Sequence, residues 1–129
     1  MEEFDIAIIG GGPAGIMAAI AASADLNVVL LEKNSSLGSK LLITGGGRCN
    51  ITNEKPIKKL LNSFHDKNFL KHSFYTFTNE MLLDLFRNRG LDFIVEDNNR
   101  VFPETEKSQD ILAILKYYLK DITIKYNYE

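Results

Sequence analysis

The sequence has one cysteine, no tryptophan and no hydrophobic run long enough to cross a lipid bilayer. A single cysteine excludes an internal disulfide framework. The longest apolar stretches, around residues 6–9, 16–22 and 28–31, fall far short of the roughly 20 residues that a transmembrane helix needs. The acidic N-terminus is the opposite of the basic start of a secretory signal. We therefore expect a globular segment in a reducing compartment, with a cytoplasmic location and no membrane partner.

The sequence also lacks a strong charge of either sign. Its net charge is −2 over 129 residues, so no basic footprint suggests a nucleic-acid partner. Only His65 and His72 accompany the lone Cys49, and no cluster has the spacing of metal ligands. The 45% apolar composition is enough for one core. We expect one domain without a metal site and without a nucleic-acid partner.

Glycine is concentrated in two loops, and the first of them follows an apolar run. The segment from Phe4 to Ile9 is typical of a buried parallel strand. The next residues match the pattern G-x-G-x-x-G at Gly10, Gly12 and Gly15. In this pattern the first glycine makes a tight turn, the second lets the backbone approach a pyrophosphate, and the third lets the helix pack closely on the strand.

The residues around this motif supply the rest of a dinucleotide-binding strand–helix–strand unit. Pro13, followed by Ala14, suits the first turn of a helix, whose N-terminus attracts an anion. A second apolar run over 28–31 ends at Glu32, near the spacing at which an acid accepts hydrogen bonds from a ribose. An ordinary glycine-rich loop is the alternative interpretation. A Walker-type phosphate loop is excluded because no Gly-Lys-Ser/Thr follows.

Short helices and strands are expected in the remaining chain. The polar stretch 34–53 is expected to be a loop, because glycine and serine are frequent in it. Helices are predicted over 55–61, 66–74, 79–89 and 109–120, the last capped by Ser108. A hairpin is predicted over 91–102, and a final strand over 122–126. The aromatic residues of the middle region are expected to form a core under the helices rather than a platform for bases: Phe64, Phe69, Phe74, Tyr75 and Phe77.

The predicted fold is α/β, a partial Rossmann-like domain with a three-stranded parallel core. Residues 1–53 and 121–129 are expected to form the nucleotide-binding core of a single domain. Residues 54–120 are expected to be an inserted helical and β-hairpin segment. We expect the third strand to pair beside the first through a right-handed crossover. Three strands leave a doubly wound sheet incomplete.

The second glycine-rich loop spans residues 44–53 and reads Thr-Gly-Gly-Gly-Arg-Cys-Asn-Ile-Thr-Asn. Its three glycines, ending at Gly47, expose consecutive N–H groups that suit an anion. Arg48 adds a planar donor fork for a pyrophosphate or a substrate carboxylate. Asn50 and Asn53 offer donors and acceptors to a heterocycle or to hydroxyl groups. The alternative is a flexible surface loop with a solvated arginine.

Together these motifs resemble a family of bacterial flavoproteins, the NAD(P)/FAD-dependent oxidoreductases or aminoacetone oxidase family. The resemblance rests on residues 10–15, on the 44–53 loop and on the segment Arg-Val-Phe-Pro at 100–103. It implies that FAD binds at Gly10–Gly15 with Glu32 on the adenosine ribose, that the reaction is hydride or electron transfer through FAD, and that NAD(P)H is a candidate electron donor. The resemblance also implies further residues along the FAD: Lys33, Lys40, Gly47, Arg48, Cys49 and Asn50.

Members of that family are roughly three times as long as this chain, as expected for more than one domain. The chain resembles their N-terminal portion, so the substrate and the catalytic residues are not identified by it. A lone Cys49 excludes flavin–disulfide chemistry within this chain, and we expect it to pack or to contact the cofactor. Glu96, Glu104 and Glu106 are expected to be solvated, and Arg100 to face the nucleotide or to form an ion pair.

Two other functions remain open at this stage. One is a non-catalytic fragment that needs the missing portion, self-association or another partner chain. The other is the nucleotide-binding domain of an NAD-dependent dehydrogenase, for which Glu32 would serve equally well. The 44–53 loop argues against the dehydrogenase.

Overall fold

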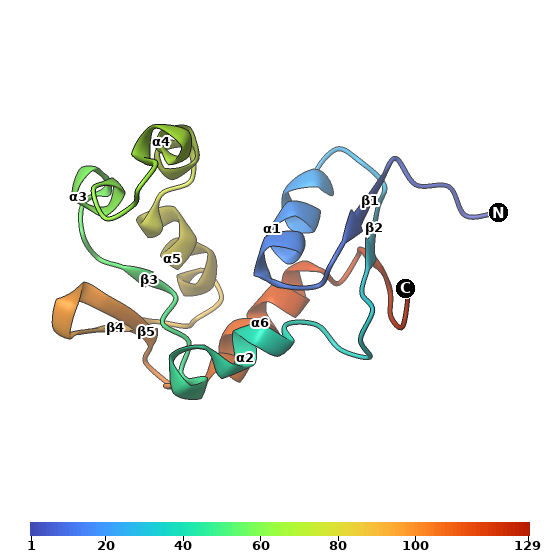
Figure 1. The fold of residues 1–129 in the computed structure, drawn as a ribbon. Helices are drawn as coiled ribbons and strands as arrows, with labels where there is room; N and C mark the ends of the chain where they lie inside the picture. The colour runs from blue at the N-terminus through green and yellow to red at the C-terminus, as the bar shows by residue number, and fades with distance from the viewer.

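The computed structural model describes all residues from Met1 to Glu129, and its fold is α/β (Figure 1). A parallel sheet consists of β1 (Ile6–Ile9), β2 (Val28–Leu31) and β6 (Thr123–Lys125). Helix α1 (Pro13–Ala22) connects the first two strands, and α6 (Ser108–Tyr118) precedes the third. The expected strand–helix–strand unit and the three-stranded parallel core are confirmed.

The order of the parallel strands is β1-β2-β6, so β6 pairs with β2. Thr123 lies opposite Val29, and Lys125 lies opposite Leu31. The expectation that the third strand lies beside the first is therefore wrong. The right-handed crossover rule fixes the hand of a connection but not which edge receives the strand. The observed order is that of the first half of a Rossmann sheet, and it leaves β1 as an edge strand. The expectation of a buried first strand is therefore wrong, since Ile6 and Ile9 are exposed.

The main core lies between the parallel sheet and its flanking helices. Leu30 of β2 and Ile16 of α1 are fully buried, and Ile111 of α6 packs in the same cluster. Phe86 joins this cluster from the inserted segment. The burial of β2 explains its apolar run Val-Val-Leu-Leu, since a strand covered on both faces has no solvent-facing positions.

The stretch expected to be a loop, 34–53, contains regular structure. It includes α2 (Ser39–Ile43), the 3₁₀ helix η1 (Thr44–Gly47) and the two-residue strand β3 (Thr52–Asn53). Leu37 and Leu41 anchor this stretch because both are buried in the main core. Tertiary packing thus orders a segment whose glycine and serine content indicated a loop.

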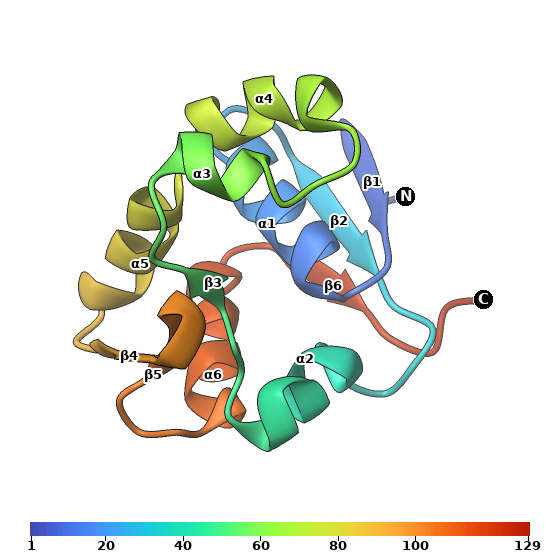
Figure 2. The ribbon, with the colours of Figure 1, turned by 60° about the vertical axis from the view of Figure 1, so that its left-hand side comes forward.

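The inserted segment carries three helices and a second, antiparallel sheet (Figure 2). The helices are α3 (Ile57–Leu61), α4 (Lys67–Thr76) and α5 (Asn79–Arg87). The sheet has the order β3-β5-β4, with β4 (Phe93–Glu96) joined to β5 (Arg100–Pro103) through the 3₁₀ turn η2 (Asp97–Asn99). Asp66 caps α4 by accepting from the N–H of Phe69, and Thr78 caps α5 in the same way.

Two expectations about this part of the chain are wrong. Lys107, not Ser108, is the N-cap of α6, and the Ser108 hydroxyl instead donates to the carbonyl of Leu42 at 2.8 Å. The aromatic group does not form a core, since α4 has no buried residue. Four of its five members are exposed, with Phe74 half-buried: Phe64 (42%), Phe69 (79%), Tyr75 (52%) and Phe77 (41%).

None of the helices combines the length and the apolar character needed to span a membrane.

Candidate functional site

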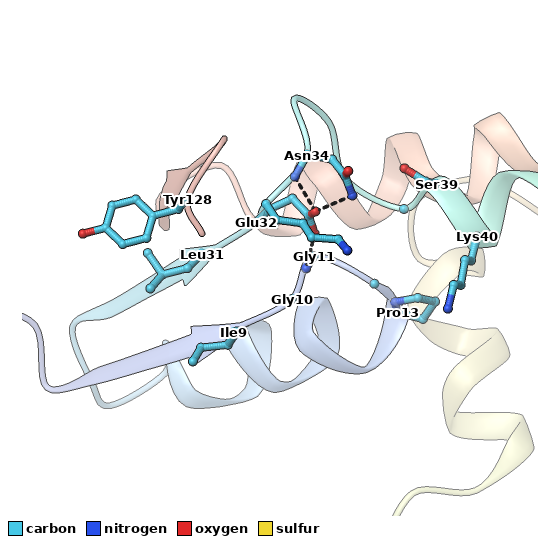
Figure 3. A pocket seen from close by; sticks show the side chains of 13 residues that line it. Ile9, Gly10, Gly11, Pro13, Leu31, Glu32, Asn34, Ser39, Lys40 and Tyr128 are labelled. Atoms are coloured by element: carbon cyan, nitrogen blue, oxygen red, sulfur yellow. Dashed lines mark hydrogen bonds between the residues drawn. The ribbon is translucent and has the colours of Figure 1, made fainter.

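A pocket of about 340 Å³ opens where β1 and β2 end and α1 begins (Figure 3). Ligands of open α/β sheets bind at this edge, outside the carboxyl ends of the strands. The pocket is lined by residues from the glycine turn, from the end of β2 and the segment after it, and from the C-terminal tail: Ile9, Gly10, Gly11, Gly12, Pro13, Leu31, Glu32, Lys33, Asn34, Gly38, Ser39, Lys40 and Tyr128.

The geometry of the glycine turn matches the roles expected for its three motif glycines. Gly10 has φ +101°, a conformation that side chains rarely adopt. A Cβ on Gly15 would collide with the carbonyl oxygen of Gly10, so α1 packs directly on the turn. A Cβ on Gly12 would meet no atom within 4 Å, and Gly12 lines the pocket. The open side of the turn is therefore the side available to a ligand.

Glu32 connects the end of β2 to this turn. Its Oε2 accepts a hydrogen bond of 2.6 Å from the N–H of Gly11. Its Oε1 accepts from the backbone N–H of Asn34 at 2.8 Å and from the Asn34 side-chain amide at 2.7 Å. The hydrogen bonds from Asn34 and Gly11 lower the pKa of Glu32, because they favour the ionised carboxylate. The buried side chain is thus held as an anion beside the pocket.

Gly11 is a structural requirement that the motif alone did not reveal. A Cβ there would collide with a methyl group of Leu37 and would lie 2.8 Å from Glu32 Oε2. Its N–H is the donor that positions the Glu32 carboxylate. The middle glycine of the Gly-Gly-Gly run therefore serves the contact between the turn and β2.

One end of the pocket is suited to an anion. Gly12 is the N-cap of α1, Pro13 occupies the first turn, and the N–H groups of Ala14 and Gly15 lie in that turn, where no intrahelical acceptor exists. The Lys40 side chain extends from α2 toward Pro13 (Figure 3). Helix-terminal N–H groups with a nearby ammonium group form an anion site.

The other end of the pocket is apolar, and the sequence analysis missed it. Ile9 and Leu31 are the last residues of β1 and β2 there, and Tyr128 lies beyond Leu31 (Figure 3). The tail after β6 is fixed by backbone hydrogen bonds, since Tyr128 donates to the carbonyl of Glu32 and Asn127 donates to that of Asn34. Tyr128 is distant in sequence from the glycine motif, so only the pairing of β6 with β2 could reveal it.

The second glycine loop lies elsewhere, and Arg48 is engaged by the hairpin. Its Nη1 is 2.7 Å from Glu96 Oε1 and 3.0 Å from Glu106 Oε1, and its guanidinium stacks 4.0 Å above the Phe102 ring. The two carboxylates raise the pKa of Arg48, and Arg48 in turn lowers the pKa of Glu96. The expectation of solvated carboxylates is therefore wrong for Glu96 and Glu106, and Arg100 pairs with Glu96 at 3.6 Å.

Cys49 and Asn50 line a different cavity, of about 220 Å³, whose lining also includes Pro13. Cys49 is buried with φ +60°, and burial raises the pKa of its thiol, so packing suits it better than a reactive thiolate. Gly47 and Arg48 line neither cavity. Six of the predicted site residues line one pocket: Gly10, Gly12, Pro13, Glu32, Lys33 and Lys40. Their role in binding a cofactor stays a prediction. The same holds for four residues outside that pocket: Gly47, Arg48, Cys49 and Asn50.

Comparison with known proteins identifies the domain. The family model described as the HI0933-like protein Rossmann domain matches residues 4–129. The chain is 34% identical over 123 residues to a 3-dehydro-bile acid delta(4,6)-reductase of Clostridium scindens, covering 93% of this chain and 30% of the relative. It is also 34% identical over 118 residues to the ribosomal RNA dihydrouridine synthase of Escherichia coli, covering 89% of this chain and 28% of the relative.

The solved structures support the same fold. THI4 of Thermovibrio ammonificans superimposes with a TM-score of 0.53 at 17% identity, over 96% of this chain and 38% of that protein. The chain thus spans 28–38% of the length of these three proteins. The chain belongs to the HI0933-like Rossmann domain family.

Proposed function

We propose that the pocket at the glycine turn binds the ADP part of FAD and that the chain is the N-terminal FAD-binding portion of a flavin-dependent oxidoreductase. The observation that carries this proposal is the order of groups along the pocket. An apolar end at Leu31 is followed by the Glu32 carboxylate and then by the anion site at the start of α1. Adenine, ribose and pyrophosphate follow one another in the same order in FAD.

The hydrogen-bond capacity of Glu32 supports the ribose assignment. A carboxylate offers about four acceptor sites, and three of those of Glu32 are used by Gly11 and Asn34. One acceptor position remains on Oε2 for a ribose hydroxyl. The same side chain therefore both fixes the glycine turn and faces the proposed adenosine.

FAD, when bound, supplies hydride and electron transfer through its isoalloxazine ring. We propose that the residues of this chain bind the FAD and orient it. The first turn of α1 and Lys40 hold the pyrophosphate, and Lys33 adds positive charge at the pocket wall. Nothing in the chain is assigned as an acid or a base, and NAD(P)H as electron donor is part of the proposal.

We propose a reductive reaction for the whole protein, because the two relatives named above are a reductase and a dihydrouridine synthase. The free edge of β1, where Ile9 is 86% exposed, is the place where a further strand would extend the sheet. We propose that the rest of a longer protein, or a partner chain, supplies that strand. A single buried cysteine supports the cytoplasmic location that we propose with it.

The test is a titration of the purified chain with FAD, ADP and NAD, followed by flavin absorbance and by the midpoint of thermal unfolding. FAD and ADP are expected to raise the midpoint, because both carry the adenosine and pyrophosphate groups that the pocket fits. NAD carries these groups too, so a larger shift with FAD than with NAD is the result expected of a flavin site. Gly12→Ala is expected to weaken both effects, since its added methyl group faces the pocket. Stabilisation by NAD but not by FAD would favour a dehydrogenase, and no effect of any of them would contradict nucleotide binding by this chain.

A further inference from the structure

Tyr128 is the only aromatic residue among the thirteen that line the nucleotide pocket. Its side chain lies at the apolar end, beside Leu31 and on the side away from the start of α1 (Figure 3). The residue is 55% exposed, and its ring pairs with no other aromatic ring of the chain. A face of this ring is therefore available to a ligand in the pocket.

The backbone of the tail holds Tyr128 in this place. Its N–H donates to the carbonyl of Glu32 at 3.0 Å, and the N–H of Asn127 donates to the carbonyl of Asn34 at 3.2 Å. Asn127 has φ +55°, a left-handed conformation that asparagine adopts more readily than most residues. Tyr128 is thus fixed beside Glu32, the residue that we propose to bind the ribose.

The position of Tyr128 suits the base of a nucleotide. In a nucleotide the base and the pyrophosphate are attached to opposite sides of the ribose, so a base must lie next to Glu32 and away from the start of α1. The other side chains at that end, Ile9 and Leu31, are aliphatic and offer apolar contact only. An aromatic ring adds a flat face on which a base can stack.

We propose that Tyr128 is a specificity-determining residue of the pocket, whose ring stacks on the adenine of the bound nucleotide and makes the pocket prefer purine over pyrimidine nucleotides. This inference rests on the proposed function, because it places the base at the apolar end of the same pocket. A two-ring purine covers more of the tyrosine ring than a one-ring pyrimidine, so it stacks more strongly.

The experiment is calorimetric titration of the full chain with ADP and with CDP, which differ only in the base. The unmodified chain is expected to bind ADP several-fold more tightly than CDP. Tyr128→Ala is expected to weaken ADP binding about tenfold and CDP binding less, so that the preference narrows. Tyr128→Phe is expected to retain the affinity for ADP, whereas Tyr128→Leu, which is apolar but has no ring, is expected to lose several-fold.

Tyr126 provides the matched control. It belongs to the same tail and is 38% exposed, but it does not line the pocket. Tyr126→Ala is therefore expected to leave the affinities for ADP and CDP unchanged. Because Tyr128 is more than half exposed, its variants are expected to keep the thermal midpoint of the unmodified chain when no ligand is present.

Fluorescence offers a direct measurement of stacking. The chain has no tryptophan, so Tyr128→Trp introduces a single one at the apolar end of the pocket. ADP is expected to quench its emission, because the indole ring stacks on the adenine, and CDP is expected to quench it less. Tyr126→Trp is expected to show no change with either nucleotide.

The outcomes distinguish this inference from the proposed function. Equal affinity of Tyr128→Ala and the unmodified chain for ADP would overturn the role of Tyr128 and leave nucleotide binding intact. ADP binding by Tyr128→Leu as tight as by Tyr128→Phe would show apolar contact in place of stacking. Equal losses of ADP and CDP would refute the purine preference. No binding of FAD or ADP by the unmodified chain would overturn the proposed function and this inference together.

Discussion

The parallel-sheet half and the inserted half of this molecule are held together in different ways. In the parallel-sheet half, fully buried aliphatic side chains such as Leu30 and Ile16 fix the strands and α1, and the pocket is built from backbone and from one carboxylate. In the inserted half, α4 buries no residue, and Arg48 ties the second glycine loop to the hairpin by ion pairs. Burial therefore positions the proposed nucleotide site. In the insert, buried side chains such as Phe86 and Phe102 are supplemented by the partly exposed ion pairs of Arg48, and α4 remains outside the buried region.

The largest expected change in the free energy of unfolding tests the difference in burial between Leu30 in the parallel sheet and Phe69 on α4. Leu30→Ala removes a fully buried side chain and is expected to lower the free energy of unfolding by about 2–5 kcal/mol. Phe69→Ala removes a larger side chain that is 79% exposed and is expected to change it by less than about 0.5 kcal/mol. Chemical denaturation of both variants measures this, and similar losses would contradict the comparison.

The glycine turn offers a second test, because two of its glycines have opposite surroundings. Gly15→Ala forces a methyl group against the carbonyl of Gly10 and is expected to cost about 1–3 kcal/mol of stability. Gly12→Ala meets no atom, and we expect it to cost less than about 1 kcal/mol while weakening binding of ADP. Denaturation and ligand titration, done on both variants, separate packing from ligand approach. Equal destabilisation by the two would refute the separate roles.

The pH dependence of stability tests the role of Glu32. Its pKa is lowered in the folded state, so its contribution is fully present above the ordinary carboxyl pKa of about 4.3 and is lost as the pH falls through the lower folded pKa. Glu32→Gln is expected to cost about 1–3 kcal/mol at neutral pH, because an amide cannot accept all three hydrogen bonds.

The measurement for Glu32 is the free energy of unfolding from neutral pH down to the acid range for both proteins. The variant is expected to approach the unmodified chain as the pH falls. A constant difference between the two would show that ionisation of Glu32 does not contribute.

The smallest loss of stability is expected on replacing Arg48, whose ion pairs join the second glycine loop to the inserted segment. Arg48→Ala is expected to lower the thermal midpoint slightly, and by less in high salt, because its ion pairs are partly exposed. Glu96→Gln is the partner variant, and the double variant is expected to lose less than the sum of the two single losses. Full additivity would show that the Arg48–Glu96 pair contributes nothing. Ligand binding is expected to stay unchanged, since Arg48 does not line the pocket.

Local signals in the sequence predicted much of this molecule. The apolar runs of β1 and β2, the glycine turn and the acid at position 32 lie within one short segment, so their pattern determined the strand–helix–strand unit and one wall of the pocket. The helices of the insert were also predicted, because their apolar spacing is local. Strand pairing could not be obtained in this way, since β6 lies about 90 residues from β2 in the chain and either edge accepts a parallel strand.

The sequence by itself therefore determined the α/β class, the glycine turn and the candidate nucleotide-binding residues Gly10, Gly12, Pro13 and Glu32. Only the tertiary structure decided that β6 lies against β2, which brings Tyr128 to the pocket. It also decided that Arg48 faces Glu96 rather than the pocket, and that Phe69 and Tyr75 of α4 remain exposed. The physical reason is that periodicity and turn chemistry act between near neighbours, whereas burial and ion pairing depend on which distant segments meet.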